Sequence, residues 1–194
     1  MFIISQAVYN DHRELEVYYN EIVNNLGNHK HQERFGHLFA WELARHSAGE
    51  ELIIYPAFEQ HLGARGREMA ERGRTEHRDI KEHLKVFQRM TATDDEYVGK
   101  LNEIWSTLAK HMGDEEESDM PALESRLQSM PGESESMAKR FGWTKVLVPS
   151  RSRNAVVHPP FATVLDLLTA PIDQIAETLR HFPDPESCPN LPTR

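Results

Sequence analysis

The chain has 194 residues, with 22 Lys or Arg against 31 Asp or Glu, so its formal net charge is −9 at pH 7. A chain of this length can bury the core of one domain, with room for an appendage. The negative charge and the lack of a basic block argue against a nucleic-acid or anionic-membrane partner, and no run is long and apolar enough to span a bilayer.

The cysteine content points to a reducing compartment. Cys188 is the single cysteine, so an internal disulfide cannot form. The short apolar start at residues 1–4 gives way at once to polar residues and does not resemble a signal peptide. We therefore expect a cytoplasmic location.

The first two predicted helices follow each other closely. Apolar residues at three- and four-residue steps predict a helix over 4–26, with His12 on its core face, and Gly27 is expected to end it. The second helix is predicted over 30–62. Pro56 should kink this helix or end its regular part, and Gly63 should stop it.

Two further helices complete a four-helix bundle. The third is predicted over 66–90, with His77 among its core-facing residues. The fourth is predicted over about 95–129, with Thr93 or Asp94 as its cap. The expected fold is all-α, with the bundle occupying residues 1–130.

The composition changes at Pro131 and Gly132, and residues 131–194 form a different kind of segment. We expect an irregular C-terminal extension that packs on the bundle through the apolar stretches at 141–143 and 145–148. Prolines are expected to start short helices near 161–168 and 172–182. The residues beyond Pro183 are expected to be disordered.

An internal repeat relates the two halves of the bundle. Residues 43–56 nearly recur at 108–121, an offset of 65, and the same offset maps 11–13 onto 76–78. Eight identities share this offset: His12/His77, Arg13/Arg78, Leu43/Leu108, Ala44/Ala109, His46/His111, Glu50/Glu115, Glu51/Glu116 and Pro56/Pro121. Each half therefore carries one histidine and then a His-x-x-x-Glu.

The repeated residues have the chemistry of metal ligands. Residues four apart lie on one face of a helix, so each His-x-x-x-Glu presents an imidazole and a carboxylate to one point. Four inward-facing helices would collect six such groups: His12, His46, Glu50, His77, His111 and Glu115. This is the ligand logic of a dinuclear site in a helix bundle, and the mixture without thiolates suits iron or manganese.

Neighbouring charged residues have several possible roles. Glu51 and Glu116 follow the expected ligands, turned away on the helix, and can support the ligands, bind metal or face solvent. Lys81, one turn after His77, cannot ligate while protonated. The matching position is Glu16, which can ligate, pair with Lys81 or face solvent.

The order His … His-x-x-x-Glu-Glu … Pro, given twice, resembles the hemerythrin-like (HHE cation-binding) family over about residues 8–123. The stretches 141–145 and 148–152 are similar to an extension of its fungal members. The resemblance implies an up-down four-helix bundle with a carboxylate-bridged, non-haem pair of iron ions, manganese being less favoured. The six residues above match the family's ligand motif.

One departure from the family pattern bears on function. Oxygen-carrying members have a His-x-x-x-His pair on the third helix, but Gly73 and Lys81 stand four residues before and after His77. A missing ligand leaves positions open, as catalytic metal sites require. We therefore expect a protein that activates O2 or peroxide and oxidises a small organic substrate.

Two alternatives stay open. In the first, the same ligands serve a non-enzymatic O2- or iron-binding, storage or sensing protein, and the extension docks a partner. A bundle without metal is the other alternative, although burying so many imidazoles and carboxylates unpaired would be costly. Both a monomer and a homodimer are compatible with the sequence.

Overall fold

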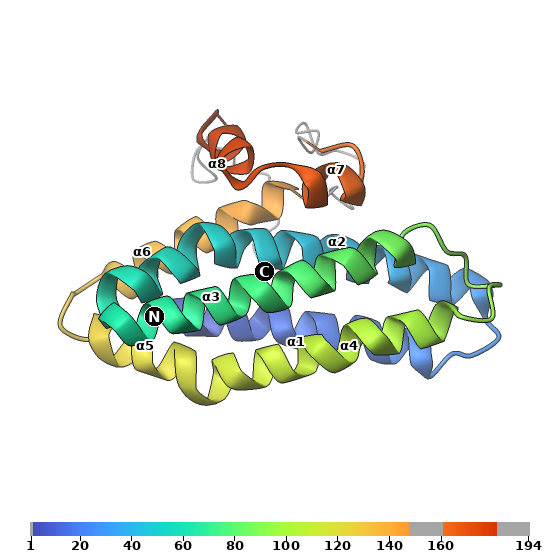
Figure 1. The fold of residues 1–194 in the computed structure, drawn as a ribbon, viewed down its shortest axis with the longest axis horizontal. Helices are drawn as coiled ribbons and strands as arrows, with labels where there is room; N and C mark the ends of the chain where they lie inside the picture. Colours follow the sequence, from blue (N-terminus) through green and yellow to red (C-terminus); the bar gives the residue numbers. More distant parts are fainter. Residues whose placement is uncertain (1, 148–160, 182–194) are drawn as a thin grey trace.

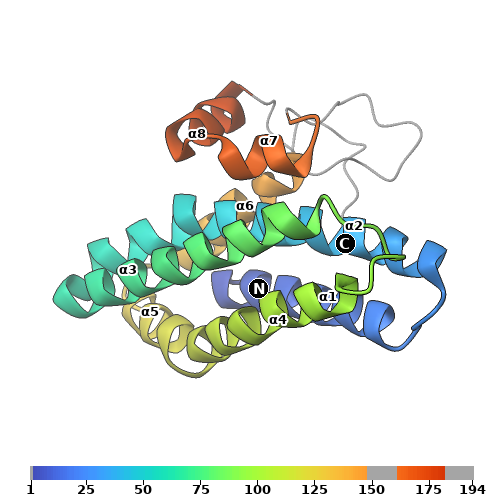
Figure 2. The same ribbon diagram turned by 45° about the vertical axis from the view of Figure 1, so that its right-hand side comes forward.

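The computed structural model describes residues 2–147 and 161–181, and all regular structure in these ranges is helical. Long helices lie side by side, with two short ones stacked on one side (Figures 1 and 2). The predicted all-α bundle is confirmed. No helix in the described ranges is long and apolar enough to cross a membrane. The predictions for 148–160 and 182–194, including Cys188 and the disordered end, lie outside the described residues.

The first half of the bundle pairs α1 (Ile4–Val23) with α2 (His29–Gly49). Gly27, in the connection, has φ of 82°, which favours glycine. The side chain of Asn28 accepts a hydrogen bond from the backbone N–H of His31 and caps α2.

Helix α2 continues through a π-helical turn, η1 (Glu50–Ile54), into α3 (Tyr55–Phe87). At Gly63 the backbone leaves the helical region, with φ of 63° and ψ of −131°, and the chain reverses its direction (Figure 1). The first arm of α3 therefore extends α2, and the second arm is the third helix of the bundle. The predicted stop at Gly63 is confirmed.

The fourth helix is built in the same way from α4 (Tyr97–Asp114), the π-helical turn η2 (Glu115–Asp119) and α5 (Met120–Leu127). The bounds of η2 are those of η1 displaced by 65 residues, so the repeat extends to the backbone. Pro56 and Pro121 lie in the first turn of the next α segment, where no N–H is required. Each π turn therefore accommodates the proline that follows it, and the helix continues beyond the proline without a break.

The predicted cap of the fourth helix is wrong. The carboxylate of Asp94 accepts a hydrogen bond from the N–H of Thr91 at 2.7 Å and closes the preceding turn. The helix begins after Glu96, which makes no side-chain cap. The Asp94 carboxylate therefore stabilises the turn before the helix instead of capping the helix.

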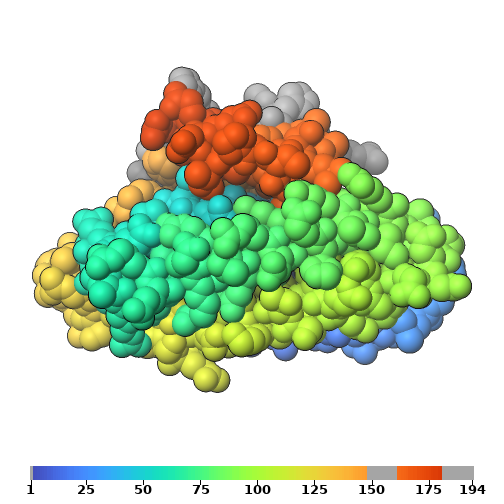
Figure 3. Space-filling model, viewed as in Figure 1, coloured from blue at the N-terminus to red at the C-terminus, as the bar shows by residue number. Residues whose placement is uncertain are grey.

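The extension adds α6 (Glu133–Trp143), a 3-10 turn η3 (Thr144–Leu147), α7 (Val164–Thr169) and α8 (Ile172–His181). Sequence patterning missed α6, whose Met137, Ala138 and Phe141 are buried against the bundle. Helices α7 and α8 cover the α2 side of the molecule (Figures 1 and 3). A capping box between Thr163 and Asp166 starts α7, later than the predicted start near Pro160.

The core consists of two apolar clusters. One contains Leu15, Leu43, Ile80 and Leu108, and the other contains Val8, Ile54, Met69 and Leu123. Along each long helix, one cluster gives way to the other near the repeated His and Glu positions. A buried polar layer therefore separates two apolar ends of the same bundle.

The side chain of Tyr97 packs closely against the backbone at Gly36. A Cβ there would lie 2.0 Å from the Tyr97 hydroxyl, whereas a Cβ at Gly113 would meet nothing within 4 Å. We expect Gly36→Ala to lower the free energy of unfolding by about 1–3 kcal/mol through overpacking. The matched Gly113→Ala should raise it by about 0.5–1 kcal/mol. Urea unfolding of the metal-free protein measures both, and equal effects would contradict this packing.

Candidate metal centre

The polar layer collects the six sequence-predicted residues in the interior. Each long helix contributes one histidine, and the two π turns each begin with a glutamate. All six are at most 2% exposed: His12, His46, Glu50, His77, His111 and Glu115. That they bind metal remains a prediction.

The two glutamates lie between imidazoles from both halves of the repeat. Glu50 Oε1 is 3.0 Å from His46 Nε2, and Glu50 Oε2 is 3.1 Å from His77 Nε2. Glu115 Oε2 is 3.3 Å from His12 Nε2, and Glu115 Oε1 is 3.5 Å from His111 Nε2. Each carboxylate therefore lies between one imidazole of its own half of the repeat and one of the other half.

The inward-facing atoms are close together but poorly bonded to one another. Within the described residues, Nε2 of His12 and of His46, Oε1 of Glu50 and both carboxylate oxygens of Glu115 have no hydrogen-bond partner. Buried polar atoms are nearly always hydrogen-bonded in proteins. Atoms that point at a common space without bonding one another have the arrangement of metal ligands.

Two groups of ligand atoms, each within 4.8 Å of one another, could hold a metal ion. The first is His12, His46, Glu50 and Glu115, and the second is Glu50, His77 and His111. Because Glu50 belongs to both groups, the two positions are adjacent. The residues present therefore fit a centre with a shared carboxylate.

A second set of carboxylates faces the outer nitrogen of every imidazole. His12 Nδ1 is 2.8 Å from Glu116 Oε1, and His111 Nδ1 is 2.8 Å from Glu76 Oε2. His77 Nδ1 is 3.3 Å from Glu51 Oε1, and His46 Nδ1 is 3.5 Å from Asp11 Oδ2. A carboxylate at Nδ1 favours the tautomer with its proton there, which leaves Nε2 free to bind metal.

These four carboxylates follow the repeat. Asp11 and Glu76 are 65 residues apart and face the histidine of their own half, whereas Glu51 and Glu116 face the histidine of the other half. The sequence pointed to Glu51 and Glu116 as supporting groups but missed Asp11 and Glu76. Their alignment immediately before the repeated His12 and His77 was the available signal.

Glu51 points in a different direction from the one expected for a regular α-helix. On a regular α-helix it would point well away from Glu50, but a π turn spreads more residues over each turn, so neighbouring side chains diverge less. Glu51 is therefore beside His77 and also accepts from Lys81 Nζ at 2.8 Å. Lys81 supports the centre through Glu51.

Glu16 lies farther from the centre. Its carboxylate is 3.2 Å from Arg13 Nη1, and about half of each of these side chains is exposed. Arg13 in turn pairs with Glu116, which faces His12. Glu16 thus contacts neither Lys81 nor an inward-facing atom among the contacts of the described residues.

The Asp11 carboxylate is part of a buried ion-pair network. The fully buried Arg45 pairs with both Asp11 and Glu42, and Lys145 Nζ lies 2.8 Å from Asp11 and 2.9 Å from Glu42. Arg45 also donates to Thr144 Oγ1 at 2.9 Å. Because two cations already balance these carboxylates, we assign no metal to this cluster.

The electrostatics of the centre favour protonated imidazoles when no metal is bound. Burial alone lowers the pKa of His12, but the nearby Glu115 and Glu50 carboxylates outweigh it and raise this pKa to about 10. Burial also lowers the pKa values of His46 and His111, but the nearby carboxylates outweigh it and raise both. A bound metal ion would replace these protons as the balancing charge.

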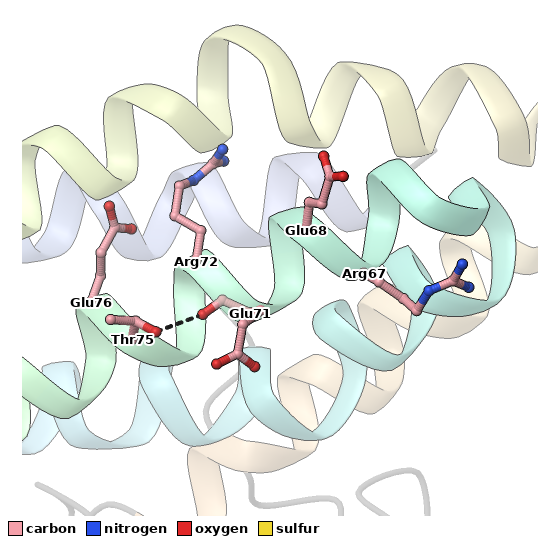
Figure 4. Close-up of a pocket in the computed structure, with 6 residues that line it drawn as sticks. All are labelled: Arg67, Glu68, Glu71, Arg72, Thr75 and Glu76. Carbon is pink, nitrogen blue, oxygen red and sulfur yellow. Dashed lines mark hydrogen bonds between the residues drawn. The ribbon is translucent and has the colours of Figure 1, made fainter.

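A surface groove lies next to the centre, lined by Arg67, Glu68, Glu71, Arg72, Thr75 and Glu76 of α3 (Figure 4). None of the six buried residues lines it. Glu76 connects the two places, because its carboxylate accepts from His111 inside and from Lys110 at the surface. Hydrogen bonding to His111, opposed by burial, lowers the pKa of Glu76 to about 2.

Comparison with known proteins agrees with this arrangement. A profile of the hemerythrin HHE cation binding domain matches residues 4–137. The chain belongs to the hemerythrin-like family. A hemerythrin-like protein of Schizosaccharomyces pombe is 42% identical over 181 residues, covering 93% of this chain and 88% of that protein. The buried His and Glu groups fit the cation binding for which the domain is described.

A solved structure gives the same fold. It is that of a hemerythrin HHE cation binding domain-containing protein from Mycobacterium kansasii, with a TM-score of 0.63 and 20% sequence identity. The likeness covers 75% of this chain and 88% of the other. At this identity it speaks for the bundle architecture alone.

Arg45 and its repeat counterpart Lys110 allow a matched test of the buried network. Arg45→Met leaves two buried carboxylates short of a cation and should lower the free energy of unfolding by about 3–5 kcal/mol. The side chain of Lys110 is 66% exposed, so Lys110→Met should lower the free energy of unfolding by less than about 1 kcal/mol. Urea unfolding of the metal-free variants compares them, and similar losses would argue against the network.

Metal loading should release protons. The raised pKa of His12, about 10, means that this imidazole is protonated at neutral pH, whereas a metal ligand must be neutral. Apparent metal affinity should therefore rise with pH up to about 10, where this imidazole loses its proton without metal. Calorimetry in buffers of different ionisation enthalpy counts the protons released, and no release at pH 7 would contradict a protonated His12 in the metal-free protein.

Proposed function

We propose that this hemerythrin-like protein holds two non-haem iron ions, binds and activates O2 or peroxide, and oxidises a small organic substrate. The observation that carries the proposal is the placement of Glu50 and Glu115. Each carboxylate lies between imidazoles from both halves of the repeat. Glu50 belongs to both groups of ligand atoms, as a carboxylate shared by two metal ions does.

The donor set is compatible with iron. Four imidazole nitrogens and two carboxylates suit iron or manganese, and the centre offers no thiolate that would select a softer metal. Manganese remains the second choice. Two iron ions bound at these positions would supply the electrons with which O2 or peroxide is reduced.

The protein's own residues leave room for a reactant. Six side chains are fewer than two octahedral ions can accept, and Gly73 and Lys81 replace the additional histidine of the oxygen carriers. Open positions are what catalytic metal centres require. The nearly complete burial of the ligands keeps bulk water away and favours small reactants.

The carboxylates that face the Nδ1 atoms orient the imidazoles and keep a proton on each Nδ1. Glu116 and Glu76 each lie 2.8 Å from an imidazole Nδ1, which keeps Nε2 directed inward. Glu76 is also 3.2 Å from the exposed Lys110 Nζ. The path from His111 through Glu76 to the surface can exchange protons with solvent while the interior stays closed.

Reduced, iron-loaded protein tests the proposal. We expect two irons per chain, and O2 consumption or peroxide decomposition that continues over several turnovers when a reductant is supplied. His46→Ala should lose iron and activity. His83→Ala is the control, because His83 is 41% exposed and pairs with Glu103 at the surface. An oxygen electrode, a peroxide assay and metal analysis make the measurements.

The outcomes separate the candidate functions. A stable, reversible O2 adduct without turnover would favour an oxygen or iron binder. Iron-loaded protein that neither consumes O2 nor decomposes peroxide would contradict the oxidase proposal. Unchanged metal content in His46→Ala would remove the centre from consideration altogether.

A further inference from the structure

Tyr55 places a hydroxyl at the edge of the candidate metal centre. It follows the π turn η1 directly and is 1% exposed. Its hydroxyl is 3.0 Å from His77 Nε2, the same nitrogen that lies 3.1 Å from Glu50 Oε2. The phenol oxygen is therefore next to the atoms that define the second metal position.

Gly73 provides the space for this hydroxyl. A Cβ at residue 73 would lie 2.6 Å from the Tyr55 hydroxyl oxygen and 2.6 Å from the ring carbon that carries it. Any larger side chain would have to displace the phenol. The glycine one turn before His77 is therefore matched to a tyrosine that reaches over it towards the centre.

The other half of the repeat lacks this device. The offset of 65 maps Tyr55 onto Met120 and Gly73 onto Val8, and both of these residues are fully buried and apolar. A large residue over a glycine in one half corresponds to two side chains of intermediate size in the other. The exchange keeps the packing but introduces a polar oxygen at one metal position only.

The Tyr55 hydroxyl lies at the metal position that has fewer His and Glu ligands. The position formed by His12 and His46 has both glutamates within its group, whereas the group around His77 and His111 has Glu50 alone. Tyr55 would bring the second group to four donors. Within the described part of the chain, the hydrogen bonds of its hydroxyl go to the imidazole of His77, so nothing else there directs it away.

We propose that the phenol oxygen of Tyr55 is a ligand of the metal ion held by Glu50, His77 and His111. This inference rests on the proposed function only in requiring a bound metal. On binding, the O–H bond breaks, the oxygen bonds to the metal, and the proton leaves to solvent with those released by the imidazoles. Tyrosine is a known protein ligand of iron.

Ferric iron is the probe, because a phenolate bound to it absorbs in the visible region and shows ring vibrations in resonance Raman spectra. We expect both signals in the wild-type protein and their loss in Tyr55→Phe, with the iron content of the centre measured in parallel. Tyr9→Phe is the matched control. Its ring centroid is 6.3 Å from that of His12, at the other metal position, and its removal should leave both signals unchanged.

A second variant covers the case in which Tyr55→Phe does not fold. Gly73→Ala places a methyl group against the hydroxyl and should weaken or shift the visible band. Wild-type protein that binds iron without a phenolate signal overturns the inference without any variant. Persistence of the signal in Tyr55→Phe, or an unaltered band in Gly73→Ala, also overturns it.

These results can be told apart from failure of the proposed function. Bound iron without a phenolate signal rejects Tyr55 as a ligand and leaves O2 activation standing. A phenolate signal in protein that does not consume O2 or decompose peroxide rejects the activity and leaves the ligand standing. Protein that binds no iron rejects both.

Discussion

Burial of four imidazoles and two carboxylates in one layer of the core is the constraint on which the bundle depends. Such groups would be unfavourable in an apolar interior without partners. Outer carboxylates satisfy Nδ1 of His12 and His111, while several inward-facing atoms have no hydrogen-bond partner among the described residues. The outer nitrogens of the layer thus have hydrogen-bond partners, whereas the inward-facing atoms are left for a cation, as a cation-binding domain requires.

The two-fold repeat arranges this layer, and its exceptions give the two halves different properties. The π turns, the two inward glutamates and the four outer carboxylates all obey the offset of 65 residues. Arg45 is fully buried, whereas its counterpart Lys110 is largely exposed. Tyr55 and its counterpart Met120 differ in polarity at the centre itself. A pair of metal ions bound here would therefore have unequal surroundings.

The extension is structurally connected to the first half of the repeat. Thr144 and Lys145 contact the network of Arg45, Asp11 and Glu42, and Asp11 faces His46. The ring of Phe141 lies edge-on to His46 with 6.1 Å between centroids. The segment after the bundle thereby closes the α2 side of the centre and supplies a cation and a hydroxyl that support one of its histidines.

The sequence by itself determined the features that depend on local spacing. The repeat and the four-residue His-to-Glu step selected the six inward residues, and Gly63 marked the reversal between the second and third helices, because helical periodicity and glycine's backbone freedom act over a few residues. Only the tertiary structure decided which groups surround those six. The π turns redirected Glu51, and packing between helices brought Asp11, Glu76 and Tyr55 to the centre. The sequence prediction omitted helix α6, although its buried Met137, Ala138 and Phe141 stand at helical spacing. Its packing against α1 depends on residues more than 100 positions apart, and only the tertiary structure decided it.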